Sequence, residues 1–344
     1  MFSPPAHDAD NREPGRKQMK AIRCVNYGAP SSLVLEETDD PAPKPGQVVI
    51  ETLAAGLGYV DALLVAGLYQ VKTPLPFVPG SEVAGKVIAL GEGVADALMG
   101  KRVMALSPSG ALAEKTALPA AACIPVPDVM SAEAAAGFIV SYCTALYGFE
   151  TCGHLAAGET VLVLGAAGGV GMAAIDVAKA MGATVIAAAS SETKRNAAKA
   201  AGADFTIDYT KNEWRAELEP LTGRRDVDLV YDPVGGDISE TAFRCLAPGG
   251  RHLVIGFAAG AIPRIPLNLP LLKRSSIVGV DWGGYIRANP ADNVPLLKTL
   301  TAMASEGRIH PEPSASYPLT EAPAVLQRLL DRESVGKPVI TFSR

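Results

Sequence analysis

The run of small residues at 165–171 is the part of this sequence best suited to bind a nucleotide. Four apolar residues, VLVL at 161–164, lead directly into GAAGGVG. A strand, a glycine-rich turn and a helix in this order form the dinucleotide fingerprint, here as AxGxxG. We expect Gly168 to let the backbone approach a pyrophosphate and Gly171 to let the helix pack closely on the strand. The start of that helix offers free N–H groups to the phosphates. A tight turn that serves packing alone is the alternative.

The end of the next strand bears on which dinucleotide binds. The segment 185–195 reads VIAAASSETKR, so Ser190 and Ser191 stand where an NAD-binding protein would carry an acidic residue for the ribose. Lys194 and Arg195 follow one turn later. A missing carboxylate together with two cations suits a 2′-phosphate, so the sequence favours NADPH over NADH. The alternative is that the two cations belong to a solvated helix face.

The histidines and cysteines do not form a recognisable metal-binding pattern. A catalytic zinc needs about three Cys, His or carboxylate ligands, and a structural zinc typically needs about four cysteines. The histidines are His7, His154, His252 and His310, and the cysteines are Cys24, Cys123, Cys143, Cys152 and Cys245. No two cysteines are separated by two residues, so we predict no metal site. Surface or packing roles are expected for the histidines and free thiols of a cytoplasmic protein for the cysteines.

Regular alternation of strands and helices begins near residue 158 and positions the glycine-rich turn. The expected strands are ETVLVLGA (159–166), TVIAAAS (184–190), DFTID (204–208), VDLVYDPVGG (227–236), RHLVIGF (251–257) and SSIVGVDW (275–282). Helical segments separate most of them, and glycines end several of these helices. Six strands in this alternation predict an α/β domain with a parallel, doubly wound sheet.

The two ends of the chain are expected to form a second domain. Short strand-like runs fill the first third, and helices are expected over 131–151. The last run, KPVITF, lies beyond the sixth strand, so we expect it to return to the first domain. The predicted divisions are an N-terminal flexible extension (1–18), the first part of the β-rich domain (19–140), the nucleotide-binding domain (141–282) and the return segment (283–344).

Charge and length narrow the class of partner. The 344 residues include 31 Lys and Arg against 36 Asp and Glu, a net charge of −5. With no long basic run, binding to nucleic acid or to an anionic membrane surface is not expected. No unbroken apolar stretch is long enough for a transmembrane helix.

Several segments, taken in order, resemble the zinc-free quinone oxidoreductase (zeta-crystallin-like) branch of the medium-chain dehydrogenase/reductase superfamily. They are GLGYVDALLVAGLY, PFVPGSEVAGKVIALGEGV, VLVLGAAGGVG, GADFTIDY, VYDPVGG, GVDWGGY and VGKPVITF. The resemblance extends from Met19 to Phe342. It implies a GroES-like catalytic domain into which a six-strand Rossmann domain is inserted, with a cleft between them. It also implies a homodimer paired through the edge strand 275–282, an exposed apolar edge that itself favours two-fold pairing.

The resemblance also implies which residues line the cleft. Those around the 2′-phosphate are Ser190, Lys194, Tyr209 and Arg332. Those of the pyrophosphate loop are Ala167, Gly168, Gly169 and Val170. Further cofactor contacts are Thr144, Gly236 near the adenosine, and two segments at the nicotinamide end, Ile255, Gly256 and Phe257 and then Val278, Gly279 and Val280. Tyr59, Asp61 and Tyr69 face the nicotinamide and the substrate.

The residues at two positions differ from those that members of related families carry there. Gly58 stands where family members often carry Asn, so a polar contact in the cleft is missing. Zinc-dependent relatives carry GHE where this chain has Ser81 and Glu82 in PGSE.

These expectations lead to an NADPH-dependent reductase of quinones or α,β-unsaturated carbonyls that works without zinc. Such acceptors take hydride at carbon and spread the resulting charge over a conjugated system, so orientation and a few donors suffice. Tyr59 or Tyr69 could donate a hydrogen bond to the developing oxyanion, or could simply form a wall of the site. A structural role is the alternative for Asp61. An enoyl-thioester reductase and a non-catalytic, crystallin-like NADPH-binding protein are the alternative functions.

Overall fold

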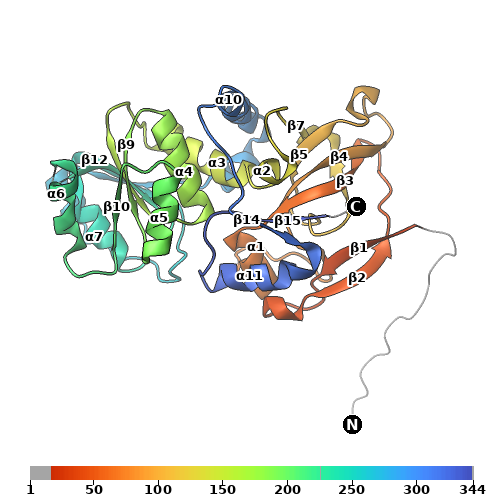
Figure 1. Ribbon diagram of the computed structural model, residues 1–344, viewed down its shortest axis with the longest axis horizontal. Helices are drawn as coiled ribbons and strands as arrows, with labels where there is room; N and C mark the ends of the chain where they lie inside the picture. Colours follow the sequence, from red (N-terminus) through yellow and green to blue (C-terminus); the bar gives the residue numbers. More distant parts are fainter. Residues whose placement is uncertain (1–16, 225, 343–344) are drawn as a thin grey trace, which may run out of the picture.

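The computed structural model describes residues 17–224 and 226–342, which form two lobes placed side by side (Figure 1). Most of the predicted N-terminal extension, residues 1–16, therefore lies outside the described residues. The first strand, β1, begins at Gln18, one residue before the predicted start at Met19.

The lobe drawn mainly in green in Figure 1 contains the predicted parallel sheet. From one edge to the other its strands are β10 (Phe205–Ile207), β9 (Thr184–Ala188), β8 (Thr160–Leu164), β11 (Val227–Asp232), β12 (Leu246–Val254) and β13 (Ser276–Gly279). Every neighbouring pair is parallel. The order places β9 on one side of β8 and β11 on the other, which is the doubly wound arrangement of dinucleotide-binding domains. The predicted six-strand fold is confirmed.

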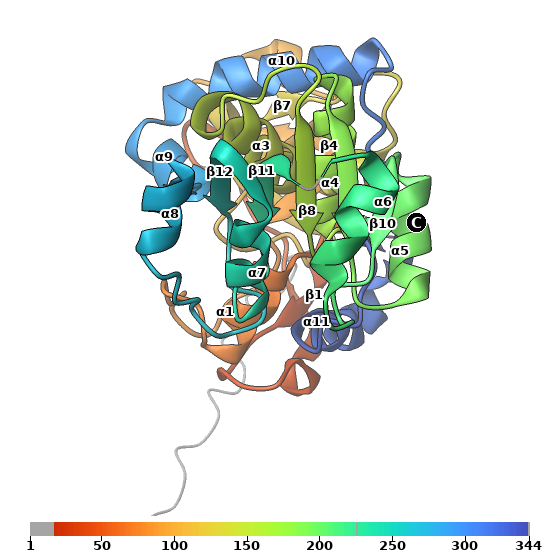
Figure 2. The same cartoon turned by 90° about the vertical axis from the view of Figure 1, so that its left-hand side faces the viewer.

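Helices cover both faces of this sheet (Figure 2). Its helices are α3 (Ile139–Leu146), α4 (Gly169–Ala180), α5 (Glu192–Ala200), α6 (Leu218–Thr222), α7 (Ile238–Arg244), α8 (Asn268–Lys273), α9 (Trp282–Ala288) and α10 (Asn293–Ser305). Alternate side chains of β8 divide between the faces: Val161 and Val163 pack with α3, α4 and α10, whereas Leu162 and Leu164 pack with α6 and α7. Burial on both faces explains why this strand is a continuous apolar run.

The sixth strand is shorter than predicted. It ends at Gly279, and Trp282 is the first residue of α9 instead of the last residue of the strand. The Asp281 side chain accepts a hydrogen bond of 2.7 Å from the N–H of Gly284, so it caps α9 and ends the extended conformation.

The second lobe is built on a seven-strand sheet. Its strands are β14 (Ala315–Pro318), β15 (Pro338–Thr341), β3 (Gln47–Gly56), β4 (Glu82–Leu90), β5 (Arg102–Leu106) and β7 (Ile124–Pro125), with β6 (Lys115–Pro119) also paired to β3. A separate pair is formed by β1 (Gln18–Arg23) and β2 (Val34–Asp39). The helices of this lobe are α1 (Tyr59–Ala66), α2 (Ala132–Ala136) and α11 (Ala322–Leu330).

The C-terminal segment returns to this lobe, as expected. Strand β15 pairs antiparallel with β3, with Val339 opposite Gly56, and α11 packs against α1. The chain therefore crosses between the lobes twice, once before α3 and once after α10 (Figure 1). The divisions at residues 140 and 282 stay predictions. Across the described part of the chain, the helices are too short or too polar to cross a bilayer.

Candidate active site

A cavity of about 510 Å³ lies between the two lobes. On the sheet side it is lined by residues that directly follow strands, including Gly165 after β8, Ala189 after β9 and Pro233 after β11. Ligands of open parallel sheets bind at the carboxyl ends of the strands, where the strand order reverses, here between β8 and β11. The fold thus places the cavity where a dinucleotide is expected.

Most of the predicted site residues line this one cavity. They are Tyr59, Asp61, Tyr69, Thr144, Ala167, Gly168, Gly169, Val170, Lys194, Tyr209, Ile255, Gly256, Phe257, Val280 and Arg332. The structure brings together residues that are up to 273 positions apart in the sequence (332 − 59). Their individual roles stay predictions.

Four predicted residues, Ser190, Gly236, Val278 and Gly279, do not line the cavity. Val278 and Gly279 lie within β13, whereas Val280, which follows the strand, lines the cavity. Gly236 occupies a turn, with φ of +66° and its N–H bonded to the carbonyl of Ala261 at 2.9 Å. Ala189, the residue before Ser190, lines the cavity instead of Ser190.

The glycine-rich turn has the geometry that the fingerprint requires. A Cβ on Gly171 would lie 2.5 Å from the carbonyl oxygen of Gly165, so only glycine permits this approach of α4 to β8. A Cβ on Gly168 would meet only that same oxygen, at 3.4 Å, so the glycine leaves the loop open toward the cavity. The first N–H groups of α4 have no carbonyl partners within the helix. The turn therefore fits a pyrophosphate.

One end of the cavity is positively charged. Lys194, at the start of α5, lies beside Arg332 in the segment after α11, and its Nζ donates a 2.8 Å hydrogen bond to the Arg332 carbonyl. The Ser191 hydroxyl caps α5 by accepting from the Lys194 N–H. Tyr209 lines the same cavity. This end thus offers two cationic side chains and a phenol to an anion.

Arg195, the second predicted cation of this helix, is placed differently from Lys194. Its guanidinium forms an ion pair with Asp208 at 3.0 Å, and Arg195 does not line the cavity. Lys194 and Arg195 are adjacent on α5, so they point in different directions, and only one of them faces the cavity.

The opposite end of the cavity is lined by aromatic and small residues. Tyr59 begins α1 and Tyr69 follows it, and both side chains are partly exposed. Neither tyrosine hydroxyl has a hydrogen-bond partner among residues 17–224 and 226–342. Thr144 also lines the cavity, but its hydroxyl donates to the Val140 carbonyl at 2.6 Å.

Four polar side chains form a buried cluster beside this end. Lys337 Nζ forms an ion pair with Glu82 Oε2, and Glu82 Oε1 accepts a 2.8 Å hydrogen bond from the N–H of Val140. Asp61 accepts hydrogen bonds from the Ser81 hydroxyl and from the N–H of Gly58, both at 2.8 Å. We refer to Asp61, Ser81, Glu82 and Lys337 as the charged cluster, and all four line the cavity.

Burial dominates the electrostatics of the charged cluster. The Glu82 side chain is 2% exposed and that of Lys337 is 11% exposed. Burial raises the pKa values of the Asp61 and Glu82 carboxyl groups above their ordinary range, although the nearby Lys337 ammonium opposes the shift. The two carboxyl groups therefore hold a proton more readily than exposed carboxyl groups do.

Sequence reasoning named Asp61 as a site residue but missed Lys337. The lysine belongs to the closing VGKPVITF segment, which indicated a returning strand and a family resemblance but no site residue. The position of this lysine in the sequence was a usable signal. It directly precedes a strand that returns to the first domain, so it is expected at the junction between the two domains. Gly336 lies at this junction and donates a 2.6 Å hydrogen bond from its N–H to the carbonyl of Ala167.

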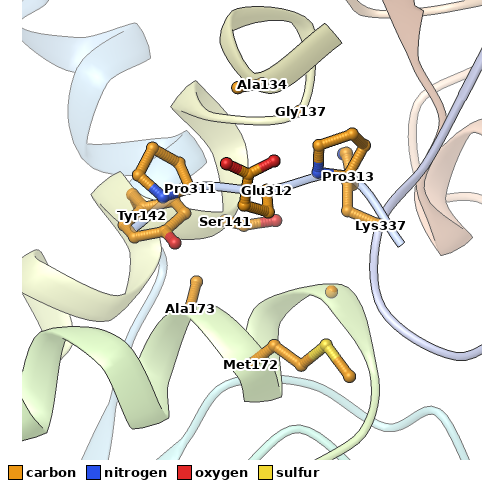
Figure 3. A pocket seen from close by; sticks show the side chains of 11 residues that line it. Ala134, Gly137, Ser141, Tyr142, Met172, Ala173, Pro311, Glu312, Pro313 and Lys337 are labelled. Atoms are coloured by element: carbon orange, nitrogen blue, oxygen red, sulfur yellow. The ribbon is translucent and has the colours of Figure 1, made fainter. Parts of the chain in front are cut away.

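A smaller pocket of about 30 Å³ lies on the other side of Lys337. Figure 3 shows Ser141 and Glu312 near its centre, with Pro311 and Pro313 on either side and Lys337 at one wall. Ser141, Gly169 and Lys337 line both this pocket and the main cavity. These three residues thus separate the two spaces.

The described histidines and cysteines lie apart. His252 is buried and contacts Asp232 at 3.0 Å, whereas His310 is exposed and lies 3.7 Å from Asp176. His154 is exposed, and His7 lies outside the described residues. All five cysteines are free. Within residues 17–224 and 226–342, no group of three or more His, Cys, Asp or Glu is arranged to hold a metal ion.

Comparison with known proteins identifies the class to which this fold and cavity belong. Residues 44–128 match the alcohol dehydrogenase GroES-like domain, and residues 169–299 match the zinc-binding dehydrogenase family. The chain is 36% identical to a quinone oxidoreductase-like protein 2 homolog from Nematostella vectensis, over 95% of this chain and 90% of that protein. The chain therefore belongs to the medium-chain dehydrogenase/reductase superfamily, among its quinone oxidoreductase-like proteins.

Two solved structures are similar over nearly the whole chain. A mycobacterial protein in complex with NADPH is 30% identical, with a TM-score of 0.85, and the match covers 94% of this chain and 100% of that one. A quinone oxidoreductase from Pseudomonas syringae pv. Tomato DC3000 is 31% identical, with a TM-score of 0.83 and the same coverage.

Proposed function

We propose that this protein is an NADPH-dependent oxidoreductase that reduces quinones or α,β-unsaturated carbonyl compounds without a catalytic metal. The observation that carries the proposal is the single cavity that joins three parts: a cationic end, a glycine-rich turn at a helix N-terminus, and an end lined by tyrosines. The similarity to an NADPH complex and to a quinone oxidoreductase supports the same choice.

The residues of the cavity would divide the work of holding the cofactor. Lys194, Arg332 and Tyr209 would bind the 2′-phosphate, and the loop 167–170 would bind the pyrophosphate. NADPH, when bound, supplies the hydride. The residues after β12 and β13, from Ile255 to Phe257 and at Val280, would hold the ring end against the tyrosines.

The inner end of the cavity would orient the acceptor and exclude water. Tyr59 and Tyr69 provide flat walls against which a quinone or enone can lie, and Trp282 and Phe257 line the same space. A conjugated acceptor distributes the charge it gains, so these walls and a few hydrogen-bond donors meet the needs of the reaction.

The test of the proposal is the consumption of NADPH in the presence of a panel of small quinones, enones and enoyl thioesters, with and without a metal chelator. We expect turnover with quinones or enones that the chelator leaves unchanged. Turnover with enoyl thioesters alone would favour the alternative reductase. NADPH binding without turnover would favour a non-catalytic protein, and activity lost together with a bound metal would contradict the metal-free mechanism.

We also propose a homodimer that pairs through the edge of the parallel sheet at β13. Ile277 on this strand is 43% exposed, and three leucines around the adjacent helix α8, Leu267, Leu271 and Leu272, are 76% to 79% exposed. Apolar side chains this exposed on an edge favour association with a second copy.

Light scattering during size-exclusion chromatography tests the dimer. We expect the wild type to elute with twice the mass of the chain, and we expect Leu271→Lys combined with Leu272→Lys to convert it to a monomer. A wild type that is monomeric at micromolar concentration would show that these leucines have another role. Val129→Lys, at an exposed residue elsewhere, is the control.

A further inference from the structure

We propose that Lys337 is a catalytic residue whose ammonium donates a hydrogen bond, and then a proton, to the oxygen of the acceptor in the main cavity. This inference rests on the proposed function and names the proton donor for it. It is carried by three features of the structure: the glycine at position 58, the path of the Lys337 side chain, and the small pocket behind the lysine.

Gly58 exposes the ammonium to the cavity. A Cβ at this position would lie 3.4 Å from Lys337 Nζ and 3.6 Å from Asp61 Oδ2, so any larger side chain would stand beside the lysine and restrict access to it. The backbone of Gly58 is extended, with φ of −130°, which other residues adopt without strain. The backbone conformation does not require glycine here. The effect of the missing side chain at Gly58 is therefore to keep this approach to Lys337 open.

The lysine stem is held so that only its end group reaches the acceptor site. A Cβ on Gly137 would lie 2.9 Å from Lys337 Cγ, and a Cβ on Gly169 would lie 3.4 Å from Lys337 Cδ. The stem therefore passes between the end of α2 and the start of α4. Nζ is fixed by Glu82, which accepts one of the three ammonium protons. The remaining protons are available to an oxygen in the cavity.

The small pocket offers a route by which the lysine is reprotonated. Its volume of about 30 Å³ is sufficient for a water molecule. Glu312, an exposed residue, lines this pocket but not the main cavity, whereas Lys337 and Ser141 line both spaces (Figure 3). A proton given to the acceptor can thus be replaced from solvent without passing through the occupied cavity.

Proton transfer from Lys337 completes the reduction that the hydride begins. The acceptor gains a hydride at carbon, and its carbonyl π-electrons move to oxygen. That oxygen takes a proton from Lys337, which leaves a neutral amine hydrogen-bonded to Glu82, and water restores the proton. An enone thereby becomes an enol that isomerises to the saturated ketone. A quinone becomes a keto tautomer of the hydroquinone, which aromatises when the ring carbon releases a proton to water and the second carbonyl oxygen takes one up.

Lys337→Met tests the proposal most directly, because methionine keeps an apolar stem and removes the ammonium. We expect kcat with quinones or enones to fall by about a hundredfold, with the KM for NADPH unchanged and the solvent isotope effect on kcat altered. Since this variant leaves Glu82 buried without its partner, the pair Glu82→Gln with Lys337→Met provides a charge-neutral version that should fold and be equally slow. Lys115→Met, which removes a lysine paired with Asp40 in the same lobe, is the control.

A second measurement does not depend on turnover. 4-Nitrophenol has a coloured phenolate, and in the protein loaded with NADP⁺ it reports whether the cavity stabilises an oxygen anion. We expect the bound phenol to ionise at lower pH in the wild type than in Lys337→Met or in Gly58→Val, which covers the ammonium but leaves the ion pair in place.

The outcomes separate the two proposals. No turnover by the wild type with any quinone or enone contradicts the proposed function. Wild-type turnover with unchanged kcat in both Lys337 variants, or equal ionisation of nitrophenol in wild type and variants, contradicts the role of Lys337. A lower melting temperature with unchanged kcat would show that the lysine only joins the two lobes.

Discussion

Replacing Lys194 with alanine is expected to weaken NADPH binding by roughly ten- to a hundredfold and to leave NADH binding nearly unchanged. Its ammonium lies at the cationic end of the cavity, and a charge-assisted contact to a phosphate contributes about 1.5–3 kcal/mol before solvent screening. NADH lacks the 2′-phosphate, so the loss applies to NADPH alone. Fluorescence titration of both cofactors measures the effect.

Arg332→Ala is expected to act in the same direction, although the residue lies 138 positions away in the sequence (332 − 194). No hydrogen bond or ion pair of the Arg332 guanidinium occurs within the described part of the chain, so the group is available to a phosphate. Ser190→Asp is expected to narrow the preference for NADPH over NADH, because the new carboxylate would repel the 2′-phosphate. Ser190 itself does not line the cavity, whereas its neighbour Ala189 does, so the carboxylate would act from behind the cavity wall.

Arg195→Ala is the matched control for these variants. It removes a cation one residue from Lys194, but that cation is paired with Asp208 and does not line the cavity. We expect it to leave the ratio of the two affinities unchanged. Equal losses for NADPH and NADH in Lys194→Ala, or a wild type that prefers NADH, would show that this end of the cavity does not bind the 2′-phosphate.

Asp232→Ala is expected to lower the free energy of unfolding by about 3–5 kcal/mol, because it removes the acceptor from a buried polar group of donors. Asp232 ends β11, and its Oδ1 accepts hydrogen bonds from the N–H groups of Val234 and Gly235 at 2.8 and 2.9 Å. Its Oδ2 accepts from the Ser239 hydroxyl and lies 3.0 Å from His252 Nε2. All of these partners lose their acceptor together.

The pKa of the Asp232 carboxyl group determines how the free energy of unfolding is expected to depend on pH. Burial alone would raise the pKa of Asp232, but the bond and charge of His252, with help from Ser239 and Gly235, outweigh burial and lower that pKa. A carboxyl group with a lowered pKa in the folded state stabilises the fold above its unfolded pKa of about 4, and this contribution is lost as the pH falls through the folded value.

Urea unfolding followed by tryptophan emission measures both effects. Trp214 and Trp282 are the two tryptophans of the chain, and both pack in the cores on either side of the parallel sheet. Asp232→Asn is the matched control, since an amide oxygen keeps the two backbone bonds, and we expect a smaller loss and a weaker dependence on acid. An Asp232→Ala variant as stable as the wild type would show that water replaces the carboxylate.

Elements that depend on a local pattern were predictable from the amino-acid sequence. The continuous apolar run of β8, the glycines of the following turn and the regular alternation after residue 158 each have a direct physical cause: burial on both faces of a sheet, close approach of α4, and the short connections between strands and helices. Ser190, in place of an acidic residue, and Lys194 likewise predict a phosphate-binding end of the cavity.

Packing of the whole molecule determines which neighbours in the sequence share a site. Lys194 and Arg195 are adjacent cations, yet one lines the cavity and the other is paired with Asp208. Lys337 meets Glu82 because β3 pairs with both β15 and β4, with Gly56 opposite Val339 and Glu82, and these pairings bring together residues 255 positions apart (337 − 82). Side-chain direction on a helix and the partner of a returning strand depend on packing against the rest of the molecule, so a local pattern does not contain them.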